Sequence, residues 1–225
     1  SSAKVKNIIR GMGPLIGLVL LFIVSSVLND SFIDPSNLKN LARQISINAL
    51  IAFGMTFVIL TGGIDLSVGS ILALSSAMMA SMITKGTNPE LAIVLSAVIG
   101  ILLGTVNGVI ISYGKVAPFI ATLATMTIYR GATLVYTNGN TISGLSDDPI
   151  FTGFGQGFIL DIPVPAIIML IAFFILFFIL KKTPLGRQTY AVGGNEKVSY
   201  ISGIKIDRIK IFAFALTGCL CALAG

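Results

Sequence analysis

Residues whose types could support chemistry gather around one acidic side chain, Asp65, in the stretch Thr-Gly-Gly-Ile-Asp-Leu-Ser-Val-Gly-Ser at 61–70. Gly62 and Gly63 disfavour a helix there, because glycine costs about 1 kcal/mol relative to alanine inside one. Asp65 or Ser67 can then cap the following helix by accepting its free N–H groups. The stretch is therefore a tight turn with an aspartate cap, a broken helix that lines a membrane pathway, or both.

Catalytic chemistry is excluded by what the sequence lacks. There is no histidine, so neither a Ser-His-Asp triad nor an HExxH zinc site can form. No phosphate-binding Gly-x-x-x-x-Gly-Lys-Ser/Thr loop occurs, and Cys219 and Cys221 lie inside an apolar run where helix packing is their expected role. We predict no catalytic residue, no metal ligand and no cofactor bound by this chain, so that any ATP is bound by a partner.

Several further polar side chains lie inside apolar runs and are candidates for a membrane pathway. Serine and threonine in a spanning helix usually bond the carbonyl one turn back, so each of them alone can also be structural. The candidate pathway or gate residues are Asn48, Thr61, Gly62, Gly63, Asp65, Ser67, Thr122 and Thr125. Asn107, Thr127 and Arg130 are other polar residues in apolar surroundings.

The elements that must position these residues are membrane helices. Of the 225 residues, 55% are hydrophobic and only 11% charged, whereas soluble domains carry about 25% charged residues. This composition excludes a soluble enzyme, a disordered region and a nucleic-acid binder. We expect an all-α, polytopic transmembrane helical bundle that forms one domain over 1–225. Its six complete spans and truncated seventh are expected at 12–28, 41–60, 66–83, 91–112, 118–136, 164–180 and 209–225.

Charge predicts the orientation of these spans. The N-terminus has Lys4, Lys6 and Arg10, and the connection 181–210 has seven basic residues against Glu196 and Asp207. The connection 137–163 has three aspartates, Asp147 and Asp148 among them, and no basic residue. Because cytoplasmic loops are rich in Lys and Arg, the N-terminus and 181–210 are predicted inside and 137–163 outside. Six crossings agree with this, and they also place Lys115 inside.

The connection 181–210 is longer than a turn between two helices requires. Gly193 and Gly194 are expected to break the chain, after which Asn195 can cap a short helix that runs to about Ser202. Glu196 is favourable in its first turn, and Gly203 can end it. The segment is either a solvated basic loop or, as we favour, a short helix that docks into a groove of another protein.

Stretches spread over nearly the whole chain resemble the permease subunits of the ribose/xylose/arabinose/galactose branch of ABC importers, ribose permeases above all. No single stretch is specific, but their combination and order are. They are NALIAFGMTFVILT (48–61), GGIDLSVGS (62–70), PFIATL (118–123), RG (130–131), VYTNG (135–139), LGR (185–187), AVGGNE (191–196) and SGI (202–204).

The resemblance implies a longer subunit, of which roughly the last third is missing here, in the bacterial cytoplasmic (inner) membrane. It implies a homodimer of permeases, a cytoplasmic ABC ATPase that holds ATP and Mg, an external sugar-binding protein and membrane lipid, but no nucleic acid. The connection 181–210 would be the cytoplasmic coupling loop, and 137–163 the external loop that faces the binding protein. By the same resemblance the ATPase would dock at Arg187, Gly193, Gly194, Asn195, Glu196, Ser202 and Gly203.

Two functions of different class follow. The leading hypothesis is the permease subunit of an ABC importer that translocates ribose or a related monosaccharide without chemistry. The alternative is a secondary transporter that couples uptake to an ion at Asp65. An intramembrane protease is a third, and the missing histidine and missing second membrane aspartate argue against it.

Overall fold

The computed structural model describes residues 12–145 and 149–225. The chain divides into two compact units, residues 1–42 and 43–225, which are described separately. Lys4, Lys6, Arg10, Asp147 and Asp148, which carried part of the orientation argument, lie outside the described residues.

The first unit holds α2 (Gly13–Leu28), the 3-10 helix η1 (Asp30–Ile33) and the start of α3 (Pro35–Leu60). No side chain of α2 is buried, as expected for an apolar helix that lipid would surround. The turn after α2 is fixed locally, because the Asn29 side chain accepts a hydrogen bond from the Ser31 amide at 3.0 Å. The rings of Phe22 and Phe32 pack edge to face at 5.1 Å.

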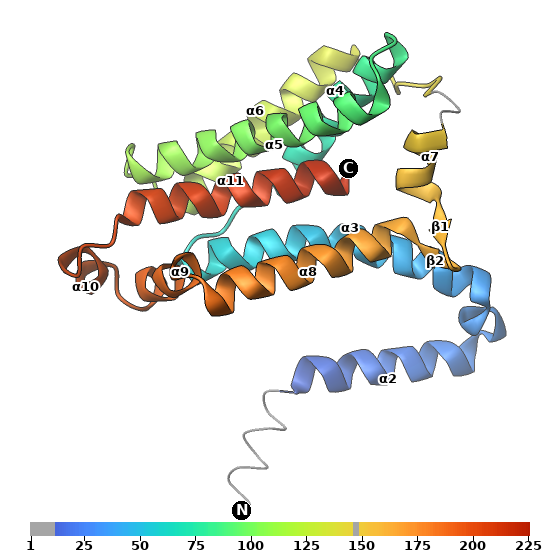
Figure 1. The fold of residues 1–225 in the computed structure, drawn as a ribbon, viewed down its shortest axis with the longest axis horizontal. Coiled ribbons are helices and arrows are strands. Elements are labelled where there is room, and N and C mark those ends of the chain that lie inside the picture. Colours follow the sequence, from blue (N-terminus) through green and yellow to red (C-terminus); the bar gives the residue numbers. More distant parts are fainter. Residues whose placement is uncertain (1–11, 146–148) are drawn as a thin grey trace, which may run out of the picture. The chain divides into compact units, whose positions relative to one another are not determined.

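The second unit is a helical bundle with one two-stranded hairpin (Figure 1). Proline stands in the first turn of five of its helices, where the missing N–H costs nothing. Besides the rest of α3 it contains α4 (Val68–Thr84), α5 (Pro89–Ser112), α6 (Pro118–Thr137), α7 (Pro149–Gln156), β1 (Phe158–Ile159), β2 (Ile162–Pro163), α8 (Val164–Lys182), α9 (Pro184–Gly194), α10 (Glu196–Ile201) and α11 (Ile206–Ala224).

Every apolar run that was predicted as a span is a helix, with ends that differ by a few residues. The sequence did not predict α7, α9, η1 or the hairpin. Among the described residues, α3, α5 and α8 are long and apolar enough to cross a membrane, and α2 and α4 are shorter apolar helices. The all-α membrane architecture is therefore confirmed, while the count of six spans and a seventh stays a prediction.

The contact between α5 and α11 is built on glycines spaced four residues apart on α5. A side-chain carbon on Gly104 would overlap the carbonyl oxygen of Phe214, and one on Gly100 would overlap that of Gly218. Small residues let membrane helices approach until their backbones touch, which maximises van der Waals contact. Helix α4 packs against α5, α6 and α11, so these four helices form the centre of the unit (Figure 1).

A second layer consists of α3 and α8, which pack against α11 through apolar side chains. Leu50, Phe57 and Val58 of α3 form one cluster with Leu176 of α8 and Phe214 of α11. The outer side of α8 stays exposed, with Phe174 and Phe178 both more than half accessible. An apolar helix face of this kind needs lipid or another protein to cover it.

Candidate functional site

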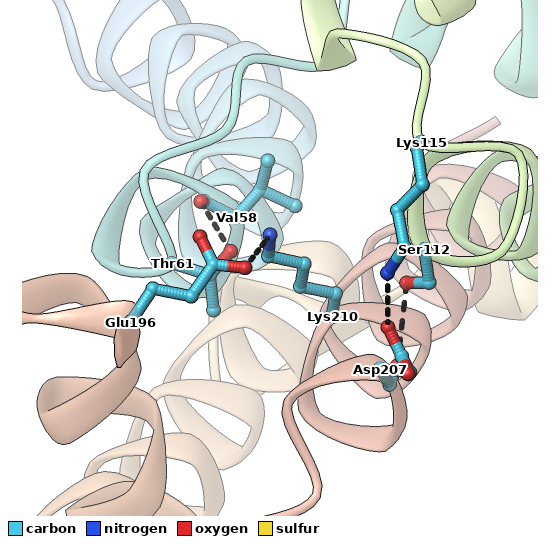
Figure 2. A network of polar contacts seen from close by, with 7 residues as sticks. All are labelled: Val58, Thr61, Ser112, Lys115, Glu196, Asp207 and Lys210. Carbon is cyan, nitrogen blue, oxygen red and sulfur yellow. Dashed lines mark hydrogen bonds and ion pairs between the residues drawn. The ribbon is translucent and has the colours of Figure 1, made fainter. Parts of the chain in front are cut away.

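The turn 61–67 between α3 and α4 begins with a glycine-terminated helix end. The Gly62 amide bonds the Ile59 carbonyl at 2.9 Å and the Gly63 amide bonds that of Val58 at 3.0 Å. This pair of bonds requires a left-handed residue after the helix, and Gly62 has φ +79°. Thr61 adds a bond from its hydroxyl to the Val58 carbonyl at 2.8 Å (Figure 2). The predicted helix break at the glycine pair is confirmed.

Asp65 lies at the centre of a buried hydrogen-bond chain. Its Oδ1 accepts from the Ser67 amide at 2.8 Å and from the Ser67 hydroxyl at 2.6 Å. Ser67 Oγ in turn accepts from Nδ2 of Asn107 on α5 at 2.7 Å. Asp65 is 2% exposed, and Ser67 and Asn107 are fully buried. These hydrogen bonds fix the start of α4 to the C-terminal part of α5.

Capping at this turn differs in detail from the prediction. Asp65 does accept an amide at the start of α4, that of Ser67, as aspartates in turns commonly do. The Ser67 side chain makes no capping bond, because its hydroxyl is used between Asp65 and Asn107. The tight-turn interpretation therefore describes the geometry, and a role in a pathway stays a prediction.

Two oxygens of the residues in this hydrogen-bond network accept no hydrogen bond from the described residues. Asp65 Oδ2 and Asn107 Oδ1 are buried without a hydrogen-bond partner, and Asp65 forms no ion pair within 12–145 and 149–225. Leaving a buried polar atom unsatisfied costs about 1–3 kcal/mol. A rearrangement of the turn that gave either oxygen a hydrogen-bond donor would remove that cost.

Of the other predicted pathway residues, Thr122 and Thr125 lie near the turn 61–67 and Asn48 does not. Thr122 on α6 is buried and donates to the Pro118 carbonyl at 2.8 Å, with the Ile64 carbonyl 3.2 Å from the same oxygen. The Thr125 hydroxyl donates to the Thr122 carbonyl at 3.2 Å, so both threonines belong to this region. Asn48 does not, because its exposed side chain bonds only the Gln44 carbonyl of its own helix.

Asn107 was not among the predicted site residues, although it was noticed as a polar residue in an apolar run. The feature that could have identified it is its position, because it is an amide beside Gly108 in a helix whose other buried residues are apolar or small. A buried amide in such a helix needs a polar partner from another element.

The segment α9–α10 has the form predicted for a docking helix. Asn195 Oδ1 accepts from the Val198 amide at 3.0 Å, so Asn195 caps α10 as expected. The helix ends at Ile201, and the chain turns at Gly203, φ +80°, where the Gly203 and Ile204 amides bond the Tyr200 and Ser199 carbonyls. The predicted break at Gly193 and Gly194 is wrong, because both close α9 and the chain turns at Asn195 instead.

All seven residues predicted to meet an ATPase are exposed. Beside them, α10 presents apolar side chains, with Val198 57%, Tyr200 74% and Ile201 84% exposed. Exposed contiguous apolar side chains rimmed by charges are typical of a protein-binding surface.

The docking segment touches the turn 61–67 directly. A side-chain carbon on Gly193 would overlap the carbonyl oxygen of Leu60, whereas one on Gly194 meets nothing within 4 Å. A cavity of about 310 Å³ lies between the two and is lined by Thr61, Gly62, Gly63, Ile111, Pro118, Val192, Gly193, Gly194, Asn195, Glu196, Lys210 and Phe214. Movement of α9 would therefore reach the end of α3 through backbone contact.

Two ion pairs hold the start of α11 to its neighbours (Figure 2). Lys210 Nζ lies 2.7 Å from Glu196 Oε1, and Lys115 Nζ lies 3.5 Å from Asp207 Oδ1. The second pair joins the α5–α6 connection to the first turn of α11. The two connections therefore lie at the same end of the unit, as the count of crossings predicted for Lys115.

Comparison with known proteins identifies a family and several relatives. Residues 37–225 match the family described as branched-chain amino acid transport system / permease component. The chain is 60% identical to the ribose import permease protein RbsC of Bacillus subtilis, over 97% of this chain and 68% of that protein. It is 45% identical to RbsC of Escherichia coli K12, over 94% and 66%. It is 38% identical to the D-allose transport system permease protein AlsC of the same strain, over 92% and 63%.

The chain spans about two thirds of the length of these relatives. No solved structure matches it.

Proposed function

Because the chain belongs to the family of permease components that residues 37–225 match, we propose that it is the transmembrane permease subunit of an ATP-binding-cassette importer. Its cargo is ribose or a related monosaccharide. The observation that carries this proposal is the 60% identity to a ribose import permease over 97% of the chain. The resemblance to ribose-type permeases drawn from the sequence agrees with it.

The comparisons give no support to the ion-coupled alternative, since the relatives are import permeases for ribose and D-allose. Asp65 is also already engaged by Ser67. Within the proposal, Asp65 fixes the geometry of a turn and binds no coupling ion.

Transport by this subunit requires no covalent step. The exposed apolar face of α10 would seat in a groove of the ATPase, which holds ATP and Mg. Closure of the ATPases would move α9 and α10, and the contact between Gly193 and the Leu60 carbonyl would pass the movement to the turn 61–67. The Asp65–Ser67–Asn107 chain then carries it to α4 and α5.

The remaining assignments belong to the same proposal. The subunit crosses the bacterial inner membrane with its N-terminus and 181–210 in the cytoplasm and 137–163 outside. It works as a homodimer, surrounded by lipid, with an external sugar-binding protein. Lipid contact is supported by the exposed apolar surface of α2 and α8.

The test is uptake of labelled ribose into proteoliposomes that contain the full-length permease, its ATPase and its binding protein. Uptake that needs both internal ATP and the binding protein is expected. ATP-dependent uptake of another monosaccharide would change the cargo only. Uptake that ignores ATP and stops when ion gradients collapse would contradict the proposal.

A further inference from the structure

A second cavity lies at the end of the unit away from α10. Its volume is about 540 Å³, and its walls come from α3, α4, α5, α7, α8 and α11. Figure 1 shows α7 at this end and α10 at the other. The wall is mainly apolar, and its polar and aromatic part consists of Arg43, Phe151, Thr152, Phe154 and Gln156. Small-molecule sites have this size and this mixture of apolar wall and few polar groups.

Arg43 is the charged group of this cavity, and contacts hold it in place. Its Nη2 donates to the Gln156 carbonyl at 3.1 Å, and its guanidinium carbon lies 5.4 Å from the centroid of the Phe158 ring. Its Nε is buried without a hydrogen-bond partner. A guanidinium has five N–H donors, so an ordered arginine that spends one of them on a backbone carbonyl can still donate to a ligand oxygen.

The chemistry of the wall selects the ligand. Among the described residues 12–145 and 149–225, the lining carries a guanidinium and no carboxylate, which favours a ligand with hydrogen-bond acceptors over a cation. Arg43 is the one basic residue that the described part of the chain contributes to the lining, whereas phosphate groups are usually held by several donors. A sugar offers many hydroxyl oxygens that accept from a guanidinium, and apolar C–H faces that pack on rings such as Phe154.

We propose that this cavity binds a neutral monosaccharide-sized polyol, with Arg43 donating to its hydroxyl oxygens. The proposal rests on the proposed function and deepens it. The cavity lies at the end of the unit opposite the docking segment, where a sugar arriving from the external binding protein would first meet the permease.

Two glycines of α7 provide a matched pair for the test. Gly155 lines the cavity and Gly153 does not, and a side-chain carbon on either meets no other atom within 4 Å. Gly155→Cys and Gly153→Cys in the full-length permease are labelled with a small maleimide, and labelling is followed by peptide mass spectrometry. We expect ribose to slow labelling at position 155 and not at 153.

Removing the guanidinium should remove this protection. In Arg43→Leu the ribose concentration needed for half-maximal protection is expected to rise at least about tenfold, because a hydrogen bond from a charged donor contributes that much to binding. Lys85→Leu, which removes a positive charge from the exposed end of α4, should leave it unchanged. In the uptake assay Gly155→Leu should raise the KM for ribose, while ATP hydrolysis stimulated by the binding protein persists and Gly153→Leu transports normally.

Equal labelling at both positions with and without ribose, together with a normal KM in Gly155→Leu, would overturn the site. Protection by ribose 5-phosphate but not by ribose would overturn its neutral ligand. The labelling needs no ATP and no partner. Protection at 155 without ATP-dependent uptake would therefore refute the proposed function alone, and ATP-dependent uptake without protection would refute the cavity alone.

Discussion

At the scale of single residues, the adjacent glycines of α9 have different surroundings. Gly193 lies against the Leu60 carbonyl with no room for a side chain, whereas Gly194 faces open space. The sequence alone cannot distinguish the two positions, because a glycine required for its small size and a glycine required for its flexibility look the same in a sequence. They differ because the backbone of Leu60, which is far away in the sequence, lies against Gly193 and not against Gly194.

Gly193→Ala should damage the contact between α9 and α3. The added methyl group cannot be accommodated by a rotamer change, because the atom it meets is backbone, and overpacking of this kind costs about 1–3 kcal/mol. We expect earlier thermal unfolding in detergent and reduced ribose uptake. Gly194→Ala is the control and should be at least as stable as the wild type, because alanine is favoured in a helix. Equal behaviour of the two variants would contradict the contact.

A bulky residue at Gly194 separates docking from folding. Gly194→Leu should leave the subunit folded and inserted, because the position is open, yet abolish uptake by keeping an ATPase away. Glu196→Lys should act similarly, because the Glu196 side chain is 55% exposed and an ion pair at the surface contributes about 0–1 kcal/mol to stability. Co-purification of the ATPase is the measurement, and a variant with normal uptake would refute the docking assignment.

Asp65 can be tested by comparing two substitutions. Asp65→Asn keeps an acceptor for Ser67 and replaces one carboxylate oxygen, the unpartnered Oδ2, by an amide donor. Asp65→Ala leaves the Ser67 amide and hydroxyl without their acceptor, at a cost of about 1–3 kcal/mol. We expect the alanine variant to unfold at a lower temperature than the asparagine variant. The opposite order would show that the charge itself stabilises the turn.

At the scale of elements, the apolar runs were sufficient to predict α2, α3, α4, α5, α6, α8 and α11, because a span needs about 20 apolar residues and little else. Short helices such as α9 were missed because isolated short helices are marginal and depend on packing. In α9 that packing is specific, since Gly186 lies against the Leu180 carbonyl and Gly193 against that of Leu60. Asn107 was missed as a site residue for a similar reason, as its partner Ser67 is 40 residues away.

The glycine contact between α5 and α11 yields a prediction for the bundle. Gly104→Leu should separate the two helices and lower the amount of monodisperse subunit recovered after heating, because its side chain has no space beside Phe214. Gly131→Leu on α6 is the control, since that position meets nothing within 4 Å. Similar recovery of both variants would contradict the close packing.

At the scale of the whole molecule, the second unit has two chemically different ends. One carries α9, α10 and the basic connections, and the other carries α7, the hairpin and the Arg43 cavity. Which end faces the cytoplasm was predicted from charge.

Cysteine accessibility tests the orientation directly. Leu160 in the hairpin is 92% exposed, and Ile201 at the end of α10 is 84% exposed. The variants Leu160→Cys and Ile201→Cys therefore place a thiol on the surface at each end. A membrane-impermeant maleimide should label position 160 from outside intact spheroplasts and position 201 only in inside-out vesicles. The reverse pattern would invert the topology and place the docking helix away from any cytoplasmic ATPase.

The uncovered face of α10 also bears on how the subunit survives in a cell before it is assembled. Val198, Tyr200 and Ile201 would be held in water until a partner arrives. Exposed apolar surface of this kind is what chaperones and proteases act on, and it favours aggregation. Synthesis of the permease and the ATPase therefore needs to be balanced, and an orphan permease would be short-lived even though its membrane helices are intact.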